Sequence, residues 1–510
     1  MKVIGTIVFL EVFSFAFCLR QLGLYQDDWA ILDHLYTGSG FSFWHGCKTL
    51  WAAGVIARPL SIPIYSALYA IGGFSPLPYH LALLAANALA AIAFYIWLER
   101  LTGDRRLALL AAALGVVYPA HPATHHLATH ILQPLAHALA LAALTVHVSW
   151  LERRTRRAGL LCGALFAAGF LAKESVAFLP LLGVAAACAR SRAHGDDGRT
   201  TLRRLPIDML PLAAAFGFGL LWQWVIKSQQ PLSVHWSLHW TRVVYVSALK
   251  SLTLETFQLL RLTGWAFLSA ADDARLLLLG LFSATASLLL LKRERETRPF
   301  DKRAVPLLLA LAAANFAAGY LPYAASGAYQ PQVVGAMSRT NEIGSWSAAL
   351  LLAMGLRWGA GRAAAQGKTA HAALITGLGF LLAACTWTNW YIAQQWAGSW
   401  SLQQDVLTRV VRWAPRLPPG ATLLVTGVPH YVNGIEVFHE GYGNWAFSYA
   451  FKLKTGRSDV NTVLPTGTLA GTPSGVVESD GGRVIRTISY SDLYQYQYEL
   501  PADKLTRVVP

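Results

Sequence analysis

Residues 78–98 read PYHLALLAANALAAIAFYIWL, a run without Asp, Glu, Lys or Arg. A helix of this length crosses a hydrocarbon core about 30 Å thick. Similar runs rich in Leu, Ala and Phe recur to about residue 390. The whole chain of 510 residues is 55% hydrophobic and 14% charged, whereas soluble domains carry about a quarter charged residues. The composition therefore excludes a water-soluble protein and predicts an all-α polytopic membrane protein.

Hydropathy predicts about eleven membrane-spanning helices. We expect them near residues 3–19, 78–98, 106–120, 131–150, 158–171, 174–190, 208–226, 275–291, 304–322, 343–357 and 370–388. The first is interpreted as a retained span, because no small-x-small cleavage site follows it. The helices at 158–171 and 174–190 are both short. The connections on either side of them are basic and should both be cytoplasmic, so two spans or a re-entrant pair fit and a single span does not.

The net charge of +15 comes largely from basic clusters between the apolar runs. The clusters lie in every second connection, at 100–106, 153–157, 190–204, 292–303 and 357–368. The positive-inside rule assigns such connections to the cytoplasm. We therefore expect a multi-pass protein of the cell inner (plasma) membrane, with a cytoplasmic N-terminus and a periplasmic tail. This placement argues against nucleic acid as a partner. The 5 Cys show no CxxC or Cys/His spacing, so no disulfide framework or zinc ribbon is expected.

The predicted division is a transmembrane domain at 1–390, with its first outward loop at 20–77, and a small outward-facing α/β domain at 391–510. Parts of a second outward segment, 227–274, fit amphipathic helices in the membrane interface. In the tail, Ala421 to Val425 fits a buried strand. Asp480-Gly481-Gly482 before Arg483 to Ile488 fits a hairpin turn and an alternating strand.

The acidic pair Asp27 and Asp28 follows the first span and is flanked by Tyr25 and Trp29, aromatic residues that favour the membrane interface. Paired carboxylates there suit a general base, or a base beside a cation-binding group. The same residues also suit the start of a short surface helix. The sequence leaves both interpretations open.

Three basic residues on the predicted outward face are candidates for binding phosphate. Arg58 ends the first outward loop, Lys173 stands beside Glu174 between two apolar halves, and Arg339 precedes Asn341 and Glu342. Arginine pairs bidentately with phosphate, and ionisable residues at membrane depth are usually functional or paired. The alternatives are a snorkelling Arg for Arg58 and Arg339, and a mutual ion pair for Lys173.

A His-rich loop follows the third predicted span. It contains His121, His125, His126 and His130. If its second half is helical, His126 and His130 share a face at i and i+4, which suits a metal. His125 points elsewhere, and hydrogen bonding at the interface is the alternative role for all of them. A divalent metal is left open.

These motifs, in this order, resemble the type C glycosyltransferase superfamily. The members are polytopic enzymes that take a sugar from a polyprenyl-phosphate or polyprenyl-diphosphate carrier, and they include protein O-mannosyltransferases and lipid A aminoarabinose transferases. The resemblance rests on five motifs and a closing outward domain. The motifs are Asp27-Asp28, Arg58-Pro59-Leu60, Pro78-Tyr79-His80, His121-Pro122 and Leu171-Ala172-Lys173-Glu174-Ser175. It covers the first 190 residues or so.

The resemblance implies a transfer to an acceptor hydroxyl on a glycan, lipid or protein, with direct inversion and a first-loop Asp as the base. Asp28 is the first choice, because it adjoins Trp29 and the predicted helix, and Asp27 is the second. Arg58, Lys173, Arg339 and His121 would bind the donor phosphate. Relatives often carry a Glu after the His-Pro motif, whereas this chain has Thr124-His125-His126 there, which weakens a metal or base role for this loop.

Three other classes of membrane protein could also account for parts of the sequence. An O-antigen ligase or polymerase-like enzyme would use outer-loop Arg and His without an Asp base, but its largest outward loop would come later in the chain. A lipid-sugar transporter or flippase would show charged residues within spans and inverted repeats. Glu11 is such a residue, and no repeat is visible. A scaffold acting through its tail is the third.

Overall fold

The computed structural model describes residues 2–36, 41–227, 237–270, 273–291, 304–327, 329–366, 368–438, 445–498 and 505–508. Most of the first 411 residues are helical, and each predicted span coincides with a helix. These helices are α1 (Lys2–Phe15), α5 (Pro76–Thr102), α6 (Arg105–Val117), α8 (Leu132–Arg153), α9 (Arg156–Ala172), α10 (Pro180–Ala193), α11 (Gly198–Lys227), α14 (Ala274–Leu291), α15 (Val305–Ser326), α16 (Glu342–Gln366) and α17 (Lys368–Val411).

Within the described residues, six helical segments are long and apolar enough to cross a membrane. They lie at Pro76–Thr102, Ala128–Arg153, Glu174–Ala193, Gly198–Ile226, Val305–Ser326 and Ala372–Arg416. The chain is thus a multi-pass membrane protein, whereas the count of eleven spans and their orientation stay predictions. The basic cluster predicted at 292–303 lies outside the described residues.

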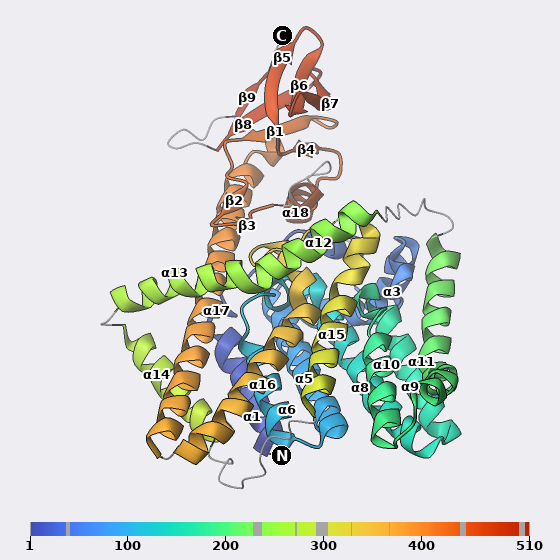
Figure 1. Cartoon of the computed structure of the whole chain (residues 1–510). Helices are drawn as coiled ribbons and strands as arrows, with labels where there is room; N and C mark the ends of the chain where they lie inside the picture. The colour runs from blue at the N-terminus through green and yellow to red at the C-terminus, as the bar shows by residue number, and fades with distance from the viewer. Residues whose placement is uncertain are drawn as a thin grey trace.

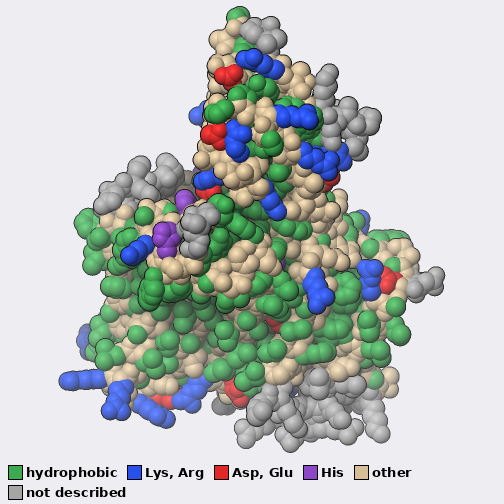
Figure 2. All heavy atoms as spheres, turned by 180° about the vertical axis from the view of Figure 1, so that it is seen from behind, with side chains coloured by type: hydrophobic (Ala, Val, Ile, Leu, Met, Phe, Trp, Pro, Cys, Tyr) green, Lys and Arg blue, Asp and Glu red, His purple; other side chains and the backbone are tan. Residues whose placement is uncertain are grey.

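The bundle core is close-packed because small residues let neighbouring helices approach. Along α6 every residue from Leu107 to Val117 is buried. The outer flanks of the bundle are apolar instead of charged, and Figure 2 shows hydrophobic side chains covering the bundle below the C-terminal domain. Lys and Arg gather at the end of the bundle far from that domain, as alternating basic connections require (Figure 2).

The first loop folds into the short helices α2 (Asp27–Leu35), α3 (Phe43–Ala52) and α4 (Ser61–Gly72). The second predicted outward segment forms α12 (Leu238–Lys250) and α13 (Thr256–Ser269), joined by a π-helical turn. Figure 1 shows these two helices crossing the bundle at its end nearest the C-terminal domain. The segment is therefore helical where described, and its place in the membrane interface stays a prediction.

The helix α17 runs without interruption through the predicted domain boundary at residue 390 and leads into the C-terminal domain (Figure 1). In that domain β1 (Thr422–Thr426) pairs in parallel with β4 (Asn461–Val463) and β8 (Leu493–Gln497), and β9 (Leu505–Arg507) closes this sheet. The remaining elements are a pair β2 (Tyr431–Val432) and β3 (Ile435–Glu436), a helix α18 (Trp445–Thr455), and a meander β5 (Thr468–Thr472), β6 (Gly475–Asp480) and β7 (Arg483–Ser489). The predicted strand at 421–425 and the predicted hairpin turn at 480–482 are confirmed.

One glycine tests how tightly the bundle is packed. A Cβ on Gly115 of α6 would lie 2.4 Å from the Trp346 ring of α16, whereas a Cβ on Gly217 of α11 would meet nothing within 4 Å. We expect Gly115→Ala to destabilise the fold by roughly 1–3 kcal/mol through overpacking. Gly217→Ala is the matched control and should stabilise it by up to about 1 kcal/mol. Thermal unfolding in detergent measures both, and equal Tm values for the two variants would contradict the packing described.

Candidate active site

The acidic pair opens α2, so the predicted short helix at this position is present. Asp28 is 2% exposed, and its carboxylate accepts three backbone N–H bonds. Tyr25 N donates to Oδ2 at 2.9 Å, Thr129 N donates to Oδ1 at 2.7 Å, and Ala128 N donates to Oδ2 at 3.3 Å. Asp28 therefore joins the start of α2 to the loop before α8, which places two distant segments side by side.

Burial raises the pKa of Asp28 to about 7, against the lowering effect of these hydrogen bonds. Both of its oxygens are already engaged by backbone donors. Asp27 is only partly buried, and no hydrogen bond to its carboxylate is found in the described part of the chain. Of the two carboxylates, Asp27 is the one free to approach a substrate.

The predicted cations Arg58 and Lys173 lie near this pair. Arg58 Nε donates to Glu174 Oε2 at 2.8 Å, and its Nη2 pairs with Oε1 of the same carboxylate. Glu174 thus pairs with Arg58 and not with Lys173. The mutual Lys173–Glu174 ion pair that the sequence offered as an alternative is therefore replaced by an Arg58–Glu174 pair. The bidentate geometry of a guanidinium and a carboxylate accounts for this choice of partner.

The Lys173 backbone N–H donates to the Gly169 carbonyl, whereas its ammonium has no hydrogen bond or ion pair in the described residues. Burial, together with the positive charges of Arg58 and Arg339, lowers the pKa of its ammonium to about 7. The negative charges of Glu174 and Asp27 act in the opposite direction. Each of these four groups is close enough to shift the Lys173 pKa, so the structure brings together five of the residues singled out in the sequence.

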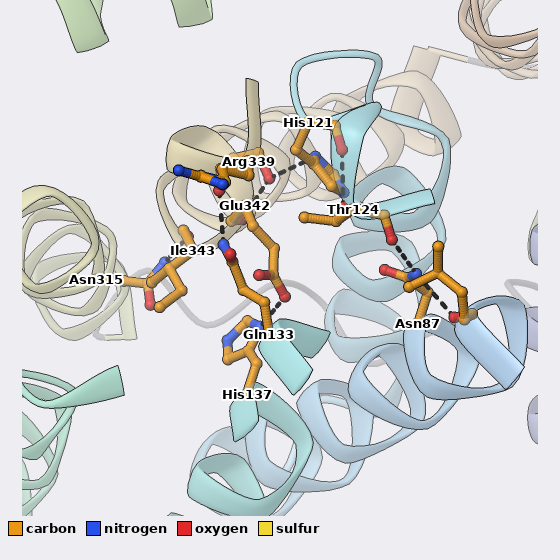
Figure 3. Close-up of polar contacts among 11 residues, drawn as sticks. Asn87, His121, Thr124, Gln133, His137, Asn315, Arg339, Glu342 and Ile343 are labelled. Carbon is orange, nitrogen blue, oxygen red and sulfur yellow. Dashed lines mark hydrogen bonds and ion pairs between the residues drawn. The ribbon is translucent and has the colours of Figure 1, made fainter. Parts of the chain in front are cut away.

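Arg339 lies in the 3-10 turn Ala336–Asn341 that precedes α16. Its Nη1 lies 2.9 Å from Nε2 of His130, and its guanidinium sits 5.0 Å from the ring centre of Tyr329. Gln133 Nε2 donates to the Arg339 carbonyl at 2.6 Å. Figure 3 shows Gln133 reaching this carbonyl from α8. The guanidinium has no carboxylate partner in the described residues, and it remains available to an anion.

The interpretation of His126 and His130 as one helical face is wrong. The helix ends at His126, Leu127 is extended, and His130 lies in a separate 3-10 turn. His125 instead lies 3.2 Å from Glu11 and stacks on Phe15 at 3.6 Å. The described residues contain no group of three or more His, Cys, Asp or Glu arranged to hold a metal. A divalent metal therefore stays an open prediction.

His121 is buried, and its side chain contacts α16. Its Nδ1 lies 3.1 Å from the Ser345 hydroxyl of α16, and burial holds its pKa well below the usual range. A neutral, hydrogen-bonded imidazole is suited to holding α16 against the loop. Figure 3 shows His121 and Thr124 on this loop, to one side of the Arg339 turn.

Two further carboxylates adjoin the site, and the sequence did not single them out as partners. Glu342 lies 3.5 Å from His137 of α8, directly beneath the Arg339 turn (Figure 3). Glu436 of β3 accepts a hydrogen bond from Ala336 N at 3.2 Å and interacts with Gln26 and with the charge of Arg339. Gly335 makes room for this contact, because a Cβ there would lie 3.1 Å from a Glu436 carboxylate oxygen.

The C-terminal domain therefore contributes to the site. Glu436 connects the Arg339 turn to Gln26, whose φ of 45° positions the first turn of α2. On the other side of α2, Lys452 of α18 donates to Asp33 at 2.8 Å. No local pattern around Glu436 signals this role, because it depends on a contact between residues 100 positions apart.

Comparison with known proteins gives one match by sequence. Residues 59–195 match the family model of dolichyl-phosphate-mannose-protein mannosyltransferases, over less than half of the chain. The match confirms the resemblance to the type C glycosyltransferase superfamily, and it includes His121 and Lys173. No curated protein sequence matches the chain.

Two solved structures of ArnT from Cupriavidus metallidurans are similar in shape. The structure bound to undecaprenyl phosphate has 12% identity and a TM-score of 0.41, over 88% of this chain and 84% of that one. The apo structure has 13% identity and the same TM-score of 0.41, over 91% and 86%. At this TM-score the likeness decides neither fold nor function.

Proposed function

We propose that the chain is a membrane glycosyltransferase that transfers a sugar from a polyprenyl-phosphate donor to an acceptor hydroxyl at the outer membrane face. The observation that carries the proposal is the proximity of the Asp27 carboxylate to two half-buried cations, Lys173 and Arg339, that have no carboxylate partner in the described residues. The family match supports the reaction class.

In the proposed reaction, Asp27 takes the proton from the acceptor hydroxyl, whose oxygen attacks the anomeric carbon. The bond between this carbon and the phosphate oxygen breaks, and polyprenyl phosphate leaves. A single displacement from the opposite side inverts the configuration. A positioned general base contributes roughly 10²–10⁴-fold in rate.

The leaving phosphate gains negative charge as the bond breaks. Lys173 and Arg339 are half-buried cations, and preorganised charge that is partly shielded from solvent stabilises a transition state more than the same charge does in water. Glu174 pairs with Arg58 and offsets its positive charge, so Arg58 adds little net charge to the site. Asp28 orients α2, so that its neighbour Asp27 faces the cations. We therefore reverse the preference drawn from the sequence and propose Asp27 as the base.

The low pKa of Lys173 makes the reaction depend on pH. Its ammonium is charged below about pH 7 and loses its proton above. We expect kcat/KM for the donor to fall about tenfold per pH unit above this point, because kcat/KM reports groups of the free enzyme. In Lys173→Arg the side chain stays charged and the fall should disappear. Lys452→Arg is the control, and a fall retained in Lys173→Arg would contradict the assignment.

A further inference from the structure

A second cavity lies at the opposite end of the bundle from the candidate active site. It has a volume of about 550 Å³ and is formed where α8 and α10 end and α11 begins. Its lining includes Arg154, Arg190, Arg204 and His194 together with Asp196 and Asp208. Figure 2 shows the Lys and Arg side chains gathered at this end of the molecule. Ligand pockets commonly have volumes of roughly 300–1,000 Å³.

The two carboxylates of the cavity are already engaged. Asp208 pairs with Arg154, and Asp196 pairs with Arg204 at 2.8 Å. No ion pair to Arg190 is found in the described residues, although this half-buried guanidinium lies in the same cavity. Arg190 therefore presents a positive charge without an ion pair to a cavity that also contains Arg154 and Arg204, each paired with one carboxylate.

The three guanidinium groups are close enough to repel one another. The charges of Arg190 and Arg204 add to burial in lowering the pKa of Arg154. The guanidinium of Arg154 lies 5.4 Å from the Trp150 ring centre. Like charges held in one cavity favour a bound anion, because an opposite charge offsets their repulsion.

One wall of the cavity is apolar and continues into the lipid-facing surface. Trp150, Leu151 and Ile207 line the cavity, and Ile207 is 61% exposed. On the same helix, Leu210 is also exposed and continues the apolar surface toward the middle of the bundle. A free phosphate would make no favourable contact with this apolar wall, whereas an acyl chain would pack along it.

We propose that this cavity binds the phosphate headgroup of an anionic glycerophospholipid, with Arg190 as the principal contact and the acyl chains along α11. Arg190 lies in the last turn of α10, where a cation also complements the helix dipole. That local role requires neither a cavity nor two neighbouring arginines. Basic pockets between membrane helices are typical binding sites for lipid phosphates.

The test measures binding of short-chain phosphatidylglycerol and phosphatidylcholine to the full chain in detergent, by native mass spectrometry. We expect tighter binding of phosphatidylglycerol and a loss of about fivefold in Arg190→Gln, since one Arg near an anionic lipid is worth on the order of 1 kcal/mol. Arg105→Gln is the matched control, because Arg105 pairs with Glu99 at 3.7 Å and does not line the cavity.

Several outcomes would overturn the proposal. Equal binding of the two lipids would show that the negative charge of the headgroup does not contribute to binding. Equal loss in Arg190→Gln and Arg105→Gln would show a general surface effect. If inorganic phosphate alone competed fully with phosphatidylglycerol at similar concentration, the cavity would be a site for free anions. Because Arg190 forms no ion pair in the described residues, its substitution should lower the Tm only slightly, by loss of the helix-dipole interaction, and the Tm is checked alongside.

Discussion

Asp27→Asn is expected to lower kcat for sugar transfer by about 10²–10⁴-fold, the contribution of a positioned general base. The amide retains the shape of the side chain but cannot accept the acceptor's proton. Insertion and folding should be unaffected, because the Asp27 carboxylate is only partly buried and forms no hydrogen bond in the described part of the chain. Steady-state kinetics with purified protein measure kcat, and the Tm reports the fold.

Two matched variants of the same helix separate the roles. Asp33→Asn removes the contact with Lys452, away from the proposed chemistry, and should retain activity. Asp28→Asn should lower the Tm instead, because three backbone N–H groups lose a charged acceptor, and hydrogen bonds to charged groups are worth about 1.5–3 kcal/mol. Full activity in both single variants, Asp27→Asn and Asp28→Asn, and in the double variant would rule out a carboxylate base.

Arg339→Gln should produce the second large effect, a drop of roughly 10²–10³-fold in kcat/KM, comparable to losing one preorganised donor in other active sites. Gln cannot supply the positive charge that the departing phosphate needs. Arg416→Gln is the control, since this Arg stacks on Trp413 in the C-terminal region. An unchanged kcat/KM in Arg339→Gln would remove Arg339 from the phosphate site.

A variant of His130 provides a second test of the role of Arg339. Its Nδ1 lies 3.3 Å from the Ala123 carbonyl, so the ring donates there and presents the Nε2 lone pair to Arg339. His130→Phe keeps a ring but loses this acceptor, and a smaller drop is expected. If His130 acts through Arg339, the double variant should be no worse than Arg339→Gln alone. Additive losses would assign His130 a separate role.

The helices were predictable from the sequence because membrane spans obey a simple rule of length and hydropathy. Every predicted range, from residues 3–19 to 370–388, coincides with a helix. The hairpin at Gly481-Gly482 was predictable because both glycines need a positive φ, and their φ values are 54° and 82°.

The partners within the site were harder to predict. The sequence neighbours Lys173 and Glu174 invite a mutual pair, yet Glu174 pairs with Arg58, 116 positions away. Likewise, Asp27 and Asp28 are equivalent in the sequence, and they are distinguished by burial and by hydrogen bonds that include those from the distant N–H groups of Ala128 and Thr129 to Asp28. Such contacts depend on tertiary packing and leave no local pattern.

The most direct test follows the donor itself by ³¹P NMR. Purified protein in liposomes receives a panel of hexosyl and pentosyl polyprenyl phosphates together with acceptors extracted from the cell envelope. We predict conversion of one sugar phosphodiester to polyprenyl phosphate, a monoester, by the wild type, and none by Asp27→Asn. If the wild type instead moved the donor across the bilayer with its phosphodiester intact, the chain would be a transporter, and the proposed glycosyl transfer would be contradicted.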